Sequence, residues 1–91
     1  MVDYIRENNV REGNYIYVYA KNIMVEIKIE TEFIKLDSFL KWAGAVGSGS
    51  DAKMVIQDGL VLVNNEVCTM RGKKIRKDDC VEFDGEIYKV I

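Results

Sequence analysis

A dense group of positive charges near the C-terminal end of the chain is the first candidate for binding chemistry. Five cations stand within seven residues, with no acidic residue among them: Arg71, Lys73, Lys74, Arg76 and Lys77. Cations this close repel one another, and the phosphates of a nucleic acid would relieve the repulsion and release counterions. A solvated loop can carry the same pattern, so residues 71–77, which we call the basic segment, leave both interpretations open.

A second candidate anion site is residues 47–53, at the predicted start of a helix. Helix N-termini offer unpaired amides, and the two glycines here would let a phosphate approach the backbone. Lys53 opposes the helix dipole, an unfavourable term that bound phosphate would offset, whereas Asp51 weakens a phosphate site. An ordinary turn with Ser48 or Ser50 as the helix cap is the simpler explanation.

Aromatic residues alternate in residues 15–20, where Tyr15, Tyr17 and Tyr19 would share one face of a strand. Such a face can stack nucleobases. Covering hydrophobic surface on an edge strand is the more ordinary role, and we expect that role here.

The residue inventory argues against catalysis and metal binding. The chain has no histidine and two cysteines, Cys68 and Cys80, which cannot supply the four N or S ligands of a structural zinc site. No nucleophile stands beside a recognisable base. We therefore expect no enzyme activity, cofactor, metal or small-molecule substrate. The two thiols are expected to be free and buried or half-buried on strands, with a disulfide as the alternative.

Length and composition indicate one compact domain. The chain has 91 residues, of which 48% are hydrophobic and 31% charged, and its net charge is −2. It contains no apolar run of the roughly 20 residues that a membrane span needs, and its N-terminus lacks the pattern of a secretory signal. We expect a cytoplasmic monomer that does not enter a membrane.

The positions of apolar residues predict two strands and then two short helices. Alternation predicts strands at 15–20 and 23–30, after a polar leader without periodicity. Helical spacing follows twice, and glycines stop each helix. The first stripe is Leu36, Phe39, Leu40 and Ala43, ending at Gly44; the second is Ala52, Val55 and Ile56, ending at Gly59.

Two hairpins complete the predicted α+β fold. Asn64 and Asn65 suit a two-residue turn between strands at 60–63 and 66–68. Asp84 and Gly85 form a strong turn signal between 80–83 and 86–91, and a two-residue loop pairs Val81 with Tyr88. The predicted architecture is a small single domain in which two short helices pack on an antiparallel sheet.

Four stretches in this order resemble a known family. They are FIKLDSFLKWAG at 33–44, SGSDAK at 48–53, IQDGLVLVNNE at 56–66 and RGKKI at 71–75. Together they resemble the RNA-binding domain named after ribosomal small-subunit protein four (the S-four-like domain, or alpha-L motif), in particular its free-standing YaaA/YbcJ-like branch. The resemblance covers residues 25–91. Residues 1–24 have no counterpart and are predicted to be an extension of one strand and a loose leader.

The resemblance implies that the start of the second helix and a basic loop contact structured RNA. Transferred position by position, the RNA-facing residues are Ser48, Lys53, Arg71, Lys73 and Lys74, with Lys35 and Lys41 at the periphery; charge alone adds Arg76 and Lys77. The sequence departs from the family where Gly49 replaces a frequent arginine and Met70 a frequent basic residue.

The combined prediction is a non-catalytic RNA-binding module that reads the shape and phosphate spacing of its target. The resemblance suggests ribosomal RNA, in ribosome assembly, with transfer RNA as a second candidate. The alternative is a protein-interaction module with the same fold. It would use the tyrosine face and residues 1–32, which hold four Lys or Arg against six Asp or Glu.

Overall fold

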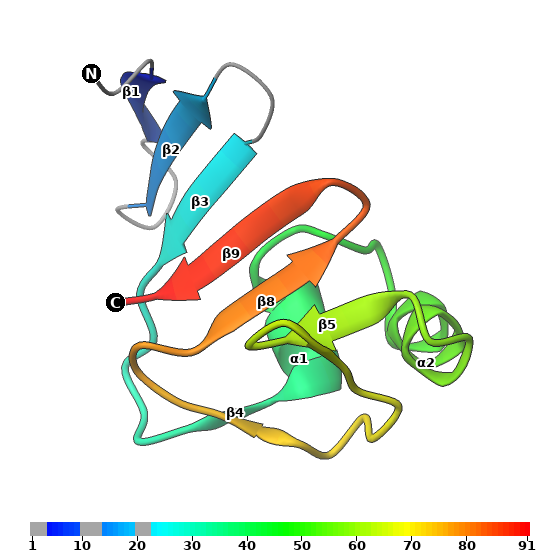
Figure 1. The fold of residues 1–91 in the computed structure, drawn as a ribbon. Helices are drawn as coiled ribbons and strands as arrows, with labels where there is room; N and C mark the ends of the chain where they lie inside the picture. The colour runs from blue at the N-terminus through cyan, green and yellow to red at the C-terminus, as the bar shows by residue number, and fades with distance from the viewer. Residues whose placement is uncertain (1–3, 10–13, 20–22) are drawn as a thin grey trace.

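The computed structural model describes the backbone of residues 4–9, 14–19 and 23–91, and the side chains of residues 24–91 (Figure 1). Along this part, strands and helices follow one another as β1 (Tyr4–Asn9), β2 (Asn14–Tyr19), β3 (Ile23–Ile27), β4 (Ile34–Lys35), α1 (Leu36–Trp42), α2 (Gly49–Gln57), β5 (Val61–Val63), β6 (Glu66–Val67), β7 (Lys74–Ile75), β8 (Cys80–Phe83) and β9 (Glu86–Val90).

The main sheet of the described residues has seven strands in the order β1-β2-β3-β9-β8-β5-β6. Its neighbouring strands are antiparallel except β3 and β9, which run parallel. A parallel pair needs a long crossover connection, and both helices lie in the chain between β3 and β9. The predicted antiparallel sheet is therefore confirmed apart from this one central pair.

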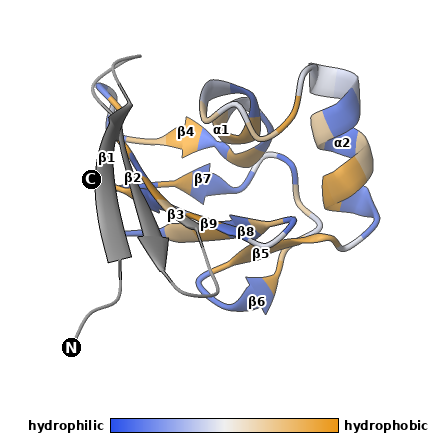
Figure 2. Cartoon of the chain, turned by 90° about the horizontal axis from the view of Figure 1, so that it is seen from above, coloured by the Kyte–Doolittle hydropathy of each residue, from blue (hydrophilic) through white to orange (hydrophobic). Residues whose placement is uncertain are grey.

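Both helices lie on one side of the main sheet (Figure 2), and α2 lies at the end farthest from β1 (Figure 1). The predicted apolar stripe of α1 is confirmed, because Leu36, Phe39 and Leu40 are all fully buried. The Phe39 ring meets the Tyr88 ring of β9 edge to face, with centroids 6.4 Å apart. The predicted α+β fold is confirmed, and its core comprises Val25, Ile27, Leu36, Phe39, Leu40, Ala52, Ile56, Val61, Val63, Ile75, Val81, Tyr88 and Val90.

The predicted turns are confirmed by their backbone angles. Asn64 and Asn65 have φ of 52° and 71°, as a two-residue hairpin turn of type I′ requires at both positions. Asp84 has φ 52° and Gly85 φ 78°, and Val81 pairs with Tyr88. Their registers place Val61 and Val63 of the first hairpin and Val81, Tyr88 and Val90 of the second in the core, whereas Val67 of the first hairpin is 61% exposed.

The N-terminal extension differs from the prediction. A loose leader is wrong for residues 4–9, because they form β1, which pairs along its whole length with β2. Backbone hydrogen bonds to a neighbouring strand can hold a polar segment that lacks side-chain periodicity. Residues 1–3 and 10–13, and the side chains of Tyr15, Tyr17 and Tyr19, lie outside the described residues. β3 runs across the proposed domain boundary between residues 24 and 25, which stays a prediction.

Candidate nucleic-acid interface

The basic segment is fixed to the start of α1 by its own backbone. The Leu36 amide donates to the Lys73 carbonyl at 2.8 Å, and the Asp37 amide donates to the Arg71 carbonyl at 3.1 Å. These amides belong to the first two residues of α1, which have no partner within the helix. Because the carbonyls face the helix, the segment is held in place while the side chains of Arg71 and Lys73 remain exposed.

A two-stranded sheet holds the middle of the basic segment. β7 pairs with β4, so that Ile34 lies opposite Ile75 and Lys35 opposite Lys74. Ile75 is fully buried, which confirms its predicted role as an anchor in the core. Lys35 and Lys74 are exposed, and like charges directly opposite each other on a strand pair are destabilising. Lys35, predicted at the periphery, therefore lies beside the basic segment.

Two cations of the basic segment lie over the aromatic ring of Phe33. The Lys74 Nζ lies 4.8 Å from the centre of the Phe33 ring, and the Arg76 Cζ lies 5.5 Å from it. Both distances fall within the range of a cation–π interaction. The role of Phe33 depends on the β4–β7 pairing, which local sequence patterns do not predict. We call Phe33, Lys35, Lys74 and Arg76 the cation cluster.

The acidic residues near the cation cluster do not neutralise its positive charges. Glu32 approaches Arg76 at 3.6 Å, but the two side chains are 87% and 50% exposed, and such a surface pair contributes little. Asp79 is engaged in structural bonds, since its carboxylate accepts from the Arg76 amide at 2.7 Å and from the Asn64 side chain at 3.1 Å. Lys77 lies in the turn that these bonds close, and its side chain is exposed.

The start of α2 is a capped helix N-terminus. Ser48 Oγ accepts from the Asp51 amide at 3.1 Å, so Ser48 rather than Ser50 is the cap. A hydroxyl has one donor and two acceptor sites, so the Ser48 O–H can still donate to a phosphate oxygen. Lys53 is exposed, and a side chain added at Gly47 would come 3.9 Å from the Asp51 carboxylate. The helix start therefore combines one free donor and one cation with a nearby negative charge.

The predicted RNA-facing residues fall into two groups. The basic segment and Lys35 are joined through β4, β7 and the first turn of α1. Ser48 and Lys53 belong to α2, and Lys41 is exposed near the end of α1. Within residues 24–91, no hydrogen bond or ion pair joins the second group to the basic segment. A single surface shared by both groups stays a prediction.

The described residues provide little for other chemistry. Among residues 24–91, no group of three or more histidine, cysteine, aspartate or glutamate side chains is placed to hold a metal ion. Cys68 and Cys80 are free and half-buried, as predicted, but only Cys80 lies on a strand, because β6 ends at Val67. Neither described helix is long and apolar enough to cross a membrane.

Comparison with known proteins identifies a family and a relative. A model of the family described as "S4 domain" matches residues 27–91. The chain is also 44% identical, over 59 residues, to the Bacillus subtilis (strain 168) protein named "Probable ribosome maturation protein RlbA"; the match covers 65% of this chain and 83% of that protein. The family match contains the basic segment, the cation cluster and the start of α2.

Proposed function

This chain belongs to the S4 domain family, as its motifs predicted, and we propose that it is a non-catalytic protein that binds structured RNA through phosphates. The observation that carries the proposal is the cation cluster. Lys35, Lys74 and Arg76 are exposed and are held together on the β4–β7 pair and the Phe33 ring.

The arrangement of these cations favours a polyanion as the partner. Lys35 lies opposite Lys74 on the strand pair, so their ammonium groups repel each other in the free protein. A phosphate bound between the two groups would remove this repulsion. Because the backbone of the basic segment is bonded to α1, binding needs little ordering of the loop. The rest of the basic segment and the start of α2 would supply further phosphate contacts.

Phosphate contacts fix the position of a protein on a nucleic acid but carry little sequence information. We therefore expect recognition of a folded RNA by the spacing of its phosphates. Ribosomal RNA during subunit assembly is the proposed target, since the relative in Bacillus subtilis is named for ribosome maturation. Transfer RNA is the second candidate.

Crosslinking in cells, followed by sequencing of the attached RNA, tests the proposal. We expect crosslinks concentrated at a few sites in ribosomal RNA, and their loss in the double variant Lys73→Glu, Lys74→Glu. Folding should survive, because a glutamate at position 74 would lie opposite Lys35. Lys89→Glu, a charge reversal on β9 outside the basic segment, is the control and should retain the crosslinks. Equal recovery of RNA by all three proteins would contradict the proposal.

A further inference from the structure

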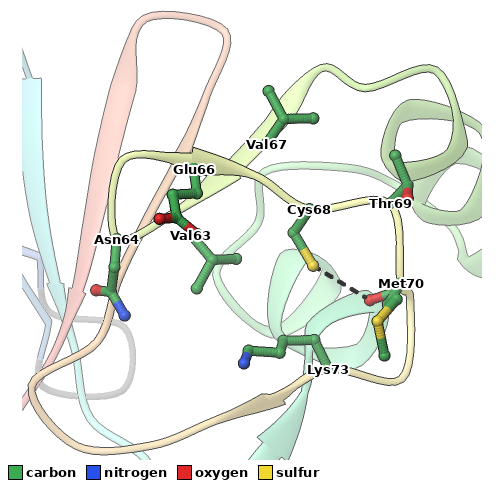
Figure 3. A pocket seen from close by; sticks show the side chains of 8 residues that line it. All are labelled: Val63, Asn64, Glu66, Val67, Cys68, Thr69, Met70 and Lys73. Carbon is green, nitrogen blue, oxygen red and sulfur yellow. Dashed lines mark hydrogen bonds between the residues drawn. The ribbon is translucent and has the colours of Figure 1, made fainter.

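A pocket with a volume of about 400 Å³ lies between the β5–β6 hairpin and the start of the basic segment (Figure 3). Its volume falls within the range of roughly 300–1,000 Å³ that is usual for small-ligand sites. Its lining includes Val63 and Val67 from the hairpin, Met70 and Lys73 from the connection to β7, and the carboxylate of Glu66.

Two polar side chains of the pocket wall already have structural partners. The Asn64 amide group donates to Asp79 at 3.1 Å, and its carbonyl oxygen accepts from the Cys80 amide at 2.9 Å. The Cys68 thiol donates to the Met70 carbonyl at 3.7 Å. Asn64 and Cys68 therefore shape the wall of the pocket and are not its binding groups.

The groups that remain for a ligand are of three kinds. Met70 is 66% exposed, which is high for a large apolar side chain, and Val63 lies opposite Glu66 across the hairpin, on the same face of the two strands. Glu66 and Lys73 are both exposed, and within residues 24–91 neither takes part in a hydrogen bond of its side chain or an ion pair. The pocket thus offers an apolar surface, the Glu66 carboxylate as a hydrogen-bond acceptor and the Lys73 ammonium as a cation. The two charged groups do not form an ion pair with each other.

We propose that this pocket holds an unpaired guanine nucleotide of the bound RNA. The base would lie against Val63 and Met70, its N1–H and N2–H would donate to the two oxygens of Glu66, and Lys73 would contact a phosphate. Unpaired bases in RNA are commonly recognised in this way, by packing against the ring and by hydrogen bonds to the Watson–Crick edge. The inference rests on the proposed RNA binding and adds a base-specific contact to it.

Guanine is the base that fits the carboxylate. Its Watson–Crick edge presents two adjacent donors, N1–H and N2–H. Adenine and cytosine each pair one donor with one ring acceptor, and uracil has one donor between two carbonyl acceptors. An acceptor facing Glu66 would be repelled, so the carboxylate favours guanine over the other three bases.

Mononucleotide titration tests the pocket without any longer RNA. In protein labelled at the methionine methyl groups, guanosine 5′-monophosphate should shift the Met70 resonance, whereas adenosine 5′-monophosphate should shift it little. Met54 on α2 is the internal control, because it is similarly exposed, at 58%, but does not line the pocket. Equal shifts of Met70 with both nucleotides would overturn the inference.

Short RNAs separate this inference from the proposed function. A uridine heptamer with one central guanosine should bind more tightly than the same heptamer with a central adenosine, and Glu66→Gln should reduce that preference by roughly tenfold, the scale of one bidentate base contact. Binding of both heptamers without preference would leave RNA binding intact and refute the guanine site. If neither heptamer binds at low salt but a structured RNA hairpin does, the guanine site is refuted and the proposed function stands; if the hairpin does not bind either, both fail.

Discussion

Replacing Lys74 by glutamine should weaken RNA binding without weakening the fold. Lys74 is exposed, faces Lys35 across the β4–β7 pair and lies over the Phe33 ring. Loss of the like-charge pair with Lys35 stabilises the free protein by about 0.2–1 kcal/mol. Loss of the exposed cation–π contact costs about 0.5–1 kcal/mol. The two changes oppose each other, so the free energy of unfolding should change by less than about 1 kcal/mol.

The effect on binding follows from counterion release. If four to six cations contact phosphates, the binding constant should fall with salt at a log–log slope of roughly −3 to −5. Removing one contact reduces the slope by roughly 0.7–0.9, which between 1 M and 0.1 M salt corresponds to about five- to eightfold in the binding constant. Lys74→Gln should therefore lose affinity at low salt and approach the unchanged protein at high salt.

Fluorescence anisotropy with a labelled RNA hairpin, measured at several salt concentrations, gives both quantities, and urea unfolding gives the stability. Lys89→Gln is the charge-matched control, because it also removes one positive charge but from β9, where Lys89 pairs in register with Glu26 of β3. Equal losses of affinity in the two variants would show that only net charge matters. A binding constant that does not depend on salt would refute the electrostatic mechanism itself.

Three further predictions concern the elements that hold the site. Ser48→Ala removes the cap on the Asp51 amide and should lower the free energy of unfolding by about 1 kcal/mol, measured by urea denaturation. Ile75→Ala, at a fully buried position, should lower it by about 2–5 kcal/mol and also reduce RNA affinity, because Ile75 anchors the basic segment; unchanged affinity in the folded variant would contradict this. Burial, followed by the hydrogen bond to Glu86, raises the pKa of Tyr88 above its ordinary value of 10.0. The folded protein thus keeps a proton that the unfolded chain loses, so stability should be constant below about pH 10 and fall above it, and Tyr88→Phe should flatten that dependence in unfolding curves at pH 8 to 11.

Local patterns determined the main helices and the hairpin turns. Leu36, Phe39 and Leu40 repeat at the spacing of one helix face, and all three are buried. The asparagine pair at 64 and 65 adopts positive φ because this residue type tolerates the left-handed region. In each case the information lies within a few residues of the chain, where sequence alone is sufficient.

Two features of the fold carried no such signal. β1 is polar and aperiodic, and it exists because β2 provides a neighbouring strand. The parallel pairing of β3 with β9 joins segments that lie far apart in the sequence, and it places Val25 opposite Tyr88 and Ile27 opposite Val90. Such pairings depend on how the whole core closes, and no short stretch of sequence encodes them.

For the candidate interface, the sequence by itself determined which residues carry charge, and the structure shows the side chains of the basic segment cations exposed. Only the tertiary structure decided how they are grouped. The carbonyls of Arg71 and Lys73 accept from the first amides of α1, and Lys35 comes to lie opposite Lys74. These contacts join residues more than thirty positions apart through strands of two residues, which are too short to show a period. The charges were therefore visible in the sequence, whereas their arrangement around Phe33 required the folded chain.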